Sequence, residues 1–376
     1  MATLPDWNDA RRILCVRLDN MGDVLMSTPA IRAMKTLRPN ARLSLMTSRS
    51  GALVADFLPD VDDTIVYDAA WVKNGSQGNE DDIAAIKELA RRRFDAAVIF
   101  TVYSQSALPG AMMCHLAGIP LILAHSRENP YRLLSHWVRE TEPQQGARHE
   151  VQRQLDLVAS VGAHSTNTRL AFLTRQADRR SMLQVLRASN VPNAGDWIVV
   201  HCGATAESRR YGANGFSSML SLLDAGGRPV LLTGSAHERE LVDRIIAGTQ
   251  GMNQLVNLAG RLDLGQFGCL IQDASLLISN NTGPVHIAAA VQTPVVDLYA
   301  LTNPQHTPWQ VEHRVLSCDV PCKYCYRSVC PYGHNACLTG IAPEEIVQAA
   351  YELLGGREAL RTMNGGATTS EGICAH

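Results

Sequence analysis

Short runs of apolar and β-branched residues alternate along the chain with longer stretches whose apolar positions recur at helical spacing. This alternation predicts parallel sheets whose strands are joined by crossover helices, and therefore an α/β fold. The predicted strands are residues 13–18, 42–46, 64–67, 96–100 and 121–124 in the first half, and 197–201, 229–233, 255–258, 276–279 and 295–299 in the second. Two open sheets of about five strands each indicate two Rossmann-like domains facing across a cleft.

Local signals predict several helices and the domain limits. After the first strand, Thr28 can cap a helix that has Pro29 in its first turn. Two further helices are expected at residues 149–161 and 176–189. The predicted organisation is an N-terminal domain at 1–175, a second domain at 176–345 that contains a cysteine-rich segment at 318–337, and a C-terminal helix with a disordered tail at 346–376. The tail is expected beyond Leu354, where the sequence becomes rich in glycine and polar residues.

Composition narrows the class of protein. A length of 376 residues suits two domains, and a formal net charge of −2 without a long basic run does not favour a nucleic-acid partner. The charged first twelve residues do not read as a secretory signal, and no segment reaches the roughly 18 apolar residues of a membrane span. We therefore expect a cytoplasmic protein.

Parallel sheets bind ligands beyond the carboxyl ends of their strands, so the loops that leave the predicted strands are the candidate sites. The first strand ends in the run from Arg17 to Asp23, where Asp23 is either a general base or a cap of the following helix. No G-x-G-x-x-G sequence occurs, which disfavours a dehydrogenase.

Three loops of the second half offer groups for a phosphorylated ligand. They contain Thr205 and Arg209, then Glu238, and then Asn281, Thr282, Gly283, Pro284 and His286. Arginine suits phosphate, and Gly283 with Pro284 at a helix start leaves backbone N–H groups for a diphosphate. Glu238 can hold ribose hydroxyls or stabilise its own helix N-terminus. The alternatives are an ordinary strand-to-helix turn at Gly283 and a solvated arginine pair.

Four segments of the chain resemble, in the same order, the motifs of the glycosyltransferase 9 family of heptosyltransferases. They are the I13-L-C-V-R-L-D-N-M-G-D-V-L-M-S-T-P-A-I31 pattern, the R209-R-Y block, the G234-S-A-H-E238 turn and the N281-T-G-P-V-H286-I-A-A-A block. The resemblance covers residues 13 to 350. It implies a GT-B fold and an inverting transfer of heptose from ADP-heptose to a hydroxyl of a lipopolysaccharide core or related acceptor. It also implies that no metal or other cofactor is required for catalysis.

The resemblance also suggests roles for individual residues. Asp23 matches the base that deprotonates the acceptor, Arg209 stands where the family usually has a diphosphate-neutralising Lys, and Glu238 matches the residue that holds the donor ribose. Thr205 lies in the Arg209 loop, while Thr282, Gly283 and His286 belong to the donor loop.

One departure from the family lies at position 281. This chain has Asn281 where the family usually has the Asp of Asp-Thr-Gly, which is associated with the donor sugar. Asparagine keeps a similar shape but loses the charge and the pure-acceptor character of a carboxylate. A different nucleotide sugar therefore stays open as the donor.

The acceptor, a lipopolysaccharide or another glycan, should bind the N-terminal half. Asn20, Arg49 and Arg127 are the candidate contacts, although single arginines are usually surface residues. A membrane-bound acceptor would bring the protein into peripheral contact with the inner membrane.

Five cysteines are crowded into a short segment near the C-terminus: Cys318, Cys322, Cys325, Cys330 and Cys337. Four thiolates would suffice for structural zinc or iron, and some proteins that resemble this family hold iron with such a cluster. The alternative is a set of reduced structural thiols. A third functional reading is a non-catalytic metal-binding interaction protein on the same scaffold.

Overall fold

The computed structural model describes residues 6–72, 79–191, 196–251 and 254–365, with side chains omitted at 79 and 356–365. Contacts divide the chain into two compact units. The first comprises Met1–Asp178, Ala289–Val291 and Asn303–Gln310, and the second comprises Arg179–Ala288, Gln292–Thr302 and Val311–His376. Of the tail that the sequence predicts beyond Leu354, residues 366–376 lie outside the described residues.

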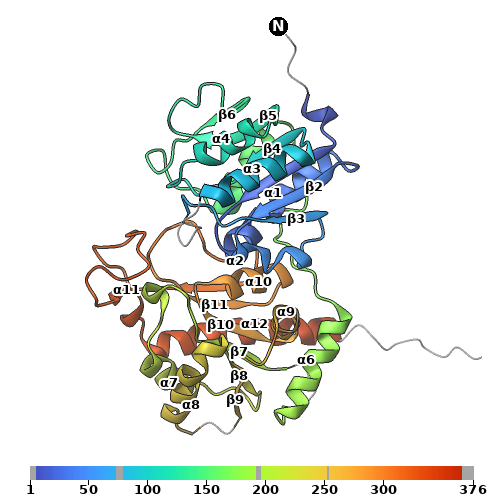
Figure 1. The fold of residues 1–376 in the computed structure, drawn as a ribbon. Coiled ribbons are helices and arrows are strands. Elements are labelled where there is room, and N and C mark those ends of the chain that lie inside the picture. The colour runs from blue at the N-terminus through green and yellow to red at the C-terminus, as the bar shows by residue number, and fades with distance from the viewer. Residues whose placement is uncertain (1–5, 73–78, 192–195, 252–253, 366–376) are drawn as a thin grey trace, which may run out of the picture. The chain divides into compact units, whose positions relative to one another are not determined.

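The first unit is built on a six-stranded parallel sheet (Figure 1). Its strands are β1 (Arg12–Arg17), β2 (Arg42–Thr47), β3 (Asp63–Val66), β4 (Ala96–Ile99), β5 (Leu121–Ser126) and β6 (His136–Arg139), in the order β3-β2-β1-β4-β5-β6. Its helices are α1 (Met21–Leu37), α2 (Arg49–Ala52), α3 (Asn79–Arg92), α4 (Leu108–Leu116) and α5 (Glu150–Ala159). Helix α1 packs against α5 and α3 against α4, so the central strands are buried.

The second unit repeats this arrangement with the order β12-β11-β10-β7-β8-β9. Its strands are β7 (Ile198–His201), β8 (Val230–Thr233), β9 (Leu255–Asn257), β10 (Leu276–Asn280), β11 (Val295–Leu298) and β12 (His313–Leu316). Its helices are α6 (Gln176–Ala188), α7 (Ala213–Leu222), α8 (Arg239–Gly248), α9 (Leu264–Asp273), α10 (Gly283–Val291), α11 (Ala336–Thr339) and α12 (Pro343–Gly365). The first few residues of α6 and the last of α10 are grouped with the first unit.

Each sheet has one strand more than the sequence predicts. The additional strands are β6 and β12, which lie at sheet edges. Their side chains are only half buried or exposed, so neither has the apolar run that marks the central strands.

The predicted start of the first helix is wrong. Helix α1 begins at Met21, with Asn20 as its N-cap, and Pro29 lies inside it. A proline at this position removes the N–H that would bond to the carbonyl of Leu25. The hydroxyl of Thr28 donates to that carbonyl at 2.7 Å instead, so the helix continues through the proline. Thr28 thus satisfies a backbone carbonyl inside the helix rather than capping the start of the helix.

The C-terminal helix is longer than expected. The sequence predicts a tail beyond Leu354, but α12 continues through Gly355 and Gly356 to Gly365. No helix in the described part of the chain has both the length and the apolar character needed to cross a bilayer.

In both parallel sheets, the direction in which successive strands are added reverses beside the first strand of the sheet. This switch point lies between β1 and β4 in the first unit and between β7 and β10 in the second. In open α/β sheets, ligands bind at the carboxyl ends of strands at such a point. We therefore expect the functional groups to lie at these two switch points.

Candidate active site

The first switch point carries Asp23 in the first turn of α1. One carboxylate oxygen, Oδ2, accepts from the backbone N–H of Asn20 at 3.1 Å, and Oδ1 lies 3.1 Å from Nη2 of Arg17. Asp23 therefore does cap its helix, as one of the two sequence interpretations holds. Because an ionised carboxylate can accept about four hydrogen bonds, capping leaves it able to receive one from a substrate hydroxyl.

Arg17, at the end of β1, is a fully buried cation that binds three carboxylates. Its Nε lies 3.1 Å from Asp19, its Nη2 contacts Asp23, and its Nη1 lies 2.7 Å from Glu150 on α5. Burial alone would lower the pKa of Arg17, but Glu150, Asp19 and Asp23 raise it above its usual range. The arginine stays charged and holds the first turn of α1 against the end of β1.

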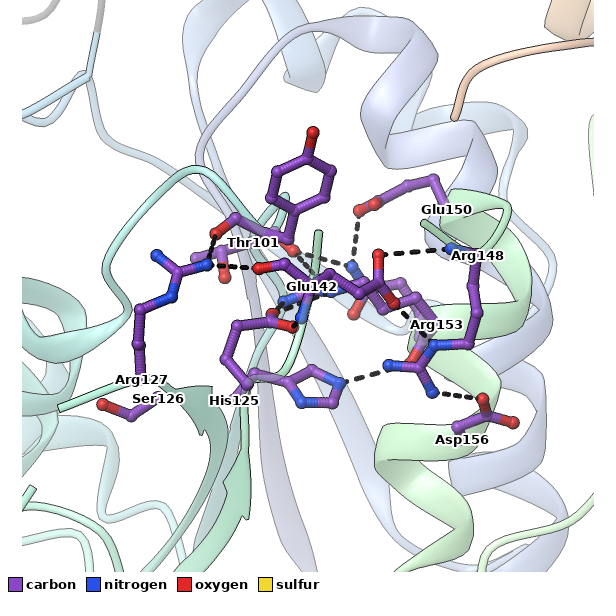
Figure 2. Close-up of polar contacts among 12 residues, drawn as sticks. Thr101, His125, Ser126, Arg127, Glu142, Arg148, Glu150, Arg153 and Asp156 are labelled. Atoms are coloured by element: carbon purple, nitrogen blue, oxygen red, sulfur yellow. Dashed lines mark hydrogen bonds and ion pairs between the residues drawn. The ribbon is translucent and has the colours of Figure 1, made fainter. Parts of the chain in front are cut away.

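A buried polar network extends from Glu150 across the end of the sheet (Figure 2). Gln154 donates to Glu150 at 2.5 Å and to the carbonyl of Thr101 at 3.0 Å. Arg153, also on α5, pairs with Glu140 and donates to the same carbonyl. The network thus fixes the residues that follow β4 to the helix that carries Glu150.

A cavity of about 310 Å³ opens at this switch point, between the ends of β1 and β4. Asp19, Trp71, Gln105 and two serines, Ser104 and Ser106, contribute to its lining. Gln105 donates to Asp19 at 2.6 Å. Burial raises the pKa of Asp19, and the nearby charge of Asp23 acts in the same direction, whereas Arg17 lowers it. An aromatic ring beside hydroxyl, amide and carboxylate groups suits a hydroxyl-rich ligand.

The three predicted acceptor residues occupy different surroundings. Asn20 is the exposed N-cap of α1, whereas the Arg49 side chain is 86% exposed and pairs with Asp68 at 3.4 Å. Arg127 donates to the carbonyls of Tyr103 and Glu142 and lines a second cavity of about 180 Å³. Asn20 thus lies beside the candidate base, and Arg127 lies at a separate cavity that shares Ser104, Gln105 and Ser106 with the first.

In the second unit, Asn280 ties together the loops that follow β7 and β10. Its Oδ1 accepts from the backbone N–H of Tyr211 at 2.9 Å, and its Nδ2 donates to the carbonyl of Cys202 at 2.9 Å. The side chain is fully buried. The loop with Thr205 and Arg209 is therefore anchored to the loop with Thr282 and Gly283.

Glu238, in the loop after β8, is held against the same β7 loop. Its Oε1 accepts from the N–H of Ala204 at 3.1 Å, and its Oε2 accepts from the N–H of Ser235 at 2.7 Å. Burial would raise the pKa of Glu238, but these hydrogen bonds and those of the Ser235 hydroxyl lower it. A Cβ at Gly203 would lie 2.2 Å from the carboxylate, so only glycine allows this approach. Glu238 is an ionised acceptor that also caps its helix, which is the more ordinary of the two sequence interpretations.

Helix α10 begins as the sequence predicts. Thr282 is its N-cap in extended conformation, and Gly283 and Pro284 form its first turn. The first N–H groups of such a helix have no partner within it and attract anions. His286 lies one turn on and is buried.

Asn281 is paired with an acid that sequence reasoning did not single out. Its Nδ2 donates to Oδ2 of Asp297 at 2.8 Å, and both side chains are buried. Burial raises the pKa of Asp297 to about 8, while the hydrogen bond from Asn281 and the charge of Arg209 oppose that rise. Arg209 therefore lies near enough to this pair to affect its ionisation.

The cysteine-rich segment is hydrogen-bonded to the loop that carries Arg209. The backbone N–H of Ser208 donates to the carbonyl of Ser328 at 2.9 Å, and the Ser208 hydroxyl donates to the carbonyl of Arg327 at 2.8 Å. Burial raises the pKa of Cys337, and the nearby Cys325, Cys322 and Cys330 raise it further. Among the residues the structure describes, no three or more His, Cys, Asp or Glu side chains are gathered in metal-ligand geometry, and the described cysteines are free thiols.

Comparison with known proteins decides the family. The model of glycosyltransferase family 9 (heptosyltransferase) matches residues 83–336, about two thirds of the chain. The chain belongs to this family. The glycosyltransferase prediction is therefore confirmed, and the two Rossmann-like sheets are those of a GT-B fold.

Individual members of glycosyltransferase family 9 are distant relatives. Lipopolysaccharide heptosyltransferase 3 of Escherichia coli K12 is 26% identical over 299 residues, which cover 77% of this chain and 82% of that protein. A family 9 glycosyltransferase structure from Veillonella parvula aligns with a TM-score of 0.75 at 19% identity, covering 94% of this chain and 99% of that one. The Escherichia coli ADP-heptose lipopolysaccharide heptosyltransferase II structure aligns with a TM-score of 0.71 at 20% identity, covering 92% and 99%.

Four buried polar residues of this family 9 member were not identified from the sequence: Arg17, Glu150, Asn280 and Asp297. Arg17 and Asp297 are charges within otherwise apolar strand runs, and such a charge needs a partner when the strand is buried. That signal was available in the sequence. Glu150 and Asn280 gave none, because their partners are distant in sequence.

Proposed function

We propose that this family 9 glycosyltransferase transfers heptose from ADP-heptose to a hydroxyl of a lipopolysaccharide core or a related glycan, with inversion at the anomeric carbon. The observation that carries the proposal is the convergence of the β7, β8 and β10 loops at one edge of the second sheet. Strand β7 pairs with both β8 and β10, so Arg209, Glu238 and the start of α10 belong to adjacent loops. This combination suits a nucleoside diphosphate.

Each of these groups has a task in the proposed donor site. Arg209 and the N–H groups at Gly283 would neutralise the diphosphate, and this stabilises negative charge as ADP departs. Glu238 would accept hydrogen bonds from the ribose hydroxyls, since its pKa is lowered and it is ionised at neutral pH. Thr205 and Thr282 border the same loops, and His286 lies behind the start of α10.

The acceptor would be activated by Asp23. The carboxylate would take the proton of the attacking hydroxyl, whose oxygen then bonds to the anomeric carbon while the bond to the ADP oxygen breaks. Nothing in this step calls for a metal ion.

We further propose that the acceptor binds the first unit at the 310 Å³ cavity beside Asp19, with Asn20 and Arg127 at its margins. The Escherichia coli relatives act on lipopolysaccharide, as their names state, and an acceptor of this class is anchored in a membrane. We therefore also propose that the protein acts at the cytoplasmic face of the inner membrane and contacts that membrane peripherally.

Titration calorimetry with ADP, UDP and GDP, each with and without magnesium, tests the donor. We expect selective binding of ADP that does not depend on magnesium, because Arg209 and α10 supply the positive charge. Preference for UDP or GDP would assign a different nucleotide sugar as the donor, which Asn281 allows. Absence of binding by all three nucleotides would remove the transferase proposal.

The same preparation tests the acceptor. With ADP-heptose and vesicles that carry lipopolysaccharide core lipid, ADP release should depend on the core lipid, and the protein should sediment with those vesicles. Plain phospholipid vesicles are the control. ADP release that is equal with both vesicles would contradict acceptor use.

We also propose that the cysteine-rich segment holds a structural zinc or iron. The chemistry of the side chains supports this proposal, because thiolates bind zinc and iron and the pKa of Cys337 is raised by burial and then by the nearby Cys325, Cys322 and Cys330. In the described residues these side chains are not gathered in ligand geometry, so the segment would have to close around the ion. Desolvation raises the pKa of the Cys330 thiol, but hydrogen bonds from the backbone N–H groups of residues 332–335 together lower it, which favours the thiolate that metals bind. When bound, the ion would cross-link this segment and so stiffen the Ser208 contacts behind Arg209.

Removing the metal should therefore weaken nucleotide binding as well as stability. We expect about one metal ion per chain by mass spectrometry of the purified protein, and a several-fold loss of ADP affinity when Cys322 and Cys325 are both changed to serine. A Cys269→Ala variant, altered at a buried thiol outside the segment, is the matched control. Wild-type protein purified without metal, or a double serine variant that binds ADP as tightly as the Cys269→Ala control does, would contradict the proposal.

A further inference from the structure

The second cavity of the first unit is lined in part by a buried histidine. The cavity has a volume of about 180 Å³, far more than a single water molecule needs. His125, at the end of β5, contributes to its lining and is only 4% exposed (Figure 2). The Nδ1 atom of its ring is buried and has no hydrogen-bond partner among the described residues. Since a buried polar atom without a partner costs free energy, Nδ1 calls for an explanation.

The other ring nitrogen determines what Nδ1 can do. Nε2 lies 3.4 Å from the backbone carbonyl oxygen of Arg153, which can only accept, so the hydrogen is assigned to Nε2. Burial and then the charge of Arg153 lower the pKa of His125 below its usual range, so the ring is neutral at pH 7. The second nitrogen of a neutral imidazole carries a lone pair. Nδ1 is therefore a hydrogen-bond acceptor.

The contact with Arg153 does not by itself require a histidine. A glutamine at this position would place an amide N–H near Nε2 and would leave no buried lone pair at the position of Nδ1. The preceding strand residues Leu123 and Ala124 are fully buried and apolar, so the strand has no need of a polar group here. The unpaired acceptor therefore indicates a ligand.

Other side chains that line the cavity also offer acceptors. The hydroxyl of Ser106 donates its single hydrogen to the carboxylate of Glu128 at 2.9 Å, and the hydroxyl of Ser126 donates to the carbonyl of Glu128 at 2.8 Å. The oxygens of both serines are then left as acceptors. Glu128 and Glu140 add carboxylates to the same lining. A ligand that fits these groups must bring hydrogen-bond donors.

Arg127 is a cation in this lining, but part of its guanidinium group is already in use. Its Nη2 donates to the backbone carbonyls of Tyr103 and Glu142. An anion in the cavity would also meet the carboxylates of Glu128 and Glu140, which repel it. A neutral group with several hydroxyls therefore fits the cavity better than a phosphate or a carboxylate does.

We propose that the 180 Å³ cavity binds a neutral sugar of the acceptor, and that Nδ1 of His125 accepts a hydrogen bond from one of its hydroxyl groups. The inference rests on the acceptor site proposed above and specifies a second part of it. The two cavities share Ser104, Gln105 and Ser106, so one glycan can reach both. The sugar that is glycosylated would occupy the larger cavity, and its neighbour would occupy the smaller one.

Two substitutions at His125 separate the contact with the ligand from the contact with Arg153. His125→Gln keeps a donor for the Arg153 carbonyl but loses the acceptor, so the KM for the core lipid should rise about 5-fold, the worth of one neutral hydrogen bond, with kcat and ADP affinity unchanged. His125→Asn can place its amide oxygen near the position of Nδ1 but loses the Arg153 contact, and its KM should stay closer to that of the wild type. A purely structural role would reverse this order. His115→Gln, at an exposed histidine of α4, is the matched control and should leave the KM unchanged.

Binding can also be observed on the wild-type protein, without transfer. Nitrogen NMR of protein with isotope-labelled histidine reports on Nδ1 directly, and the signal of His125 is the one that His125→Asn lacks. Methyl mannoside, a neutral sugar, should shift this signal, and its phosphate ester should not. A shift with the phosphate ester alone, or with neither sugar, would overturn the inference even where the protein transfers heptose. A protein that shows the shift but transfers no heptose would overturn the proposed function and leave the sugar site in place.

Discussion

Replacing Asp23 with asparagine is expected to lower kcat by about 10²–10⁴-fold, the usual contribution of a positioned general base. Asparagine is nearly isosteric with aspartate and can still accept from the N–H of Asn20, so α1 should keep its cap. It cannot accept a proton at neutral pH. The loss should therefore appear in kcat, with ADP-heptose affinity and the melting temperature little changed.

Asp19→Asn is the matched control for this variant. Asp19 binds the same Arg17, at 3.1 Å through Nε, and undergoes the same chemical change. If Asp23 is the base, Asp19→Asn should cost far less in kcat and should act mainly on the KM of the acceptor, since Asp19 lines the proposed acceptor cavity. Steady-state kinetics on both variants decide between them. A larger loss of kcat in Asp19→Asn would assign the base to Asp19 instead.

Features that depend on short stretches of sequence were predicted well. The buried strands β1 and β10 and the start of α10 each follow from a local run of residues, and all three lie near their predicted places. Edge strand β6 was missed because its half-buried side chains give no apolar run. The start of α1 was misplaced because a proline such as Pro29 usually lies in the first turn of a helix. The hydrogen bond from the Thr28 hydroxyl to the Leu25 carbonyl, which allows the helix to continue through Pro29, cannot be read from the sequence pattern.

The candidate site likewise contains residues that could be predicted from the sequence and residues that could not. The motif residues Asp23, Arg209 and Glu238 lie at carboxyl ends of strands, as the topology requires. Their supporting partners could not be predicted, because Glu150 lies 133 residues from Arg17 and Asn280 lies 69 residues from Tyr211. Only the folded sheets bring such residues together.

Arg17→Met should reduce the free energy of unfolding by about 3–5 kcal/mol, the usual cost of removing one partner of a buried ion pair. Methionine fills much of the space but leaves Glu150, which is 0% exposed, without its counter-charge. Asp19 and Asp23 would lose the same partner. Guanidinium unfolding of the variant and the wild type at pH 7 measures the difference, and a loss below about 1 kcal/mol would contradict it.

A second substitution separates charge from packing. In Arg17→Met/Glu150→Met the buried carboxylate is removed as well, and at least half of the lost stability should return, since an apolar pair can replace a buried ion pair. The two other carboxylates are only 12% and 14% exposed at their side chains, so recovery should be incomplete. No recovery would indicate that Arg17 acts through its shape.

The pH dependence of the single variant gives a further check on the same charge. Burial already raises the pKa of Glu150, and Arg17 is the first group that opposes that rise. Without Arg17 the folded-state pKa must move higher still, so the folded variant binds a proton that the unfolded chain releases above its ordinary pKa of about 4.3. Stability linked to such a group is present at low pH and lost as pH rises through the folded-state pKa. Arg17→Met should therefore lie closest to the wild type near pH 5 and fall furthest below it near pH 8, whereas a defect of packing alone would leave the difference independent of pH.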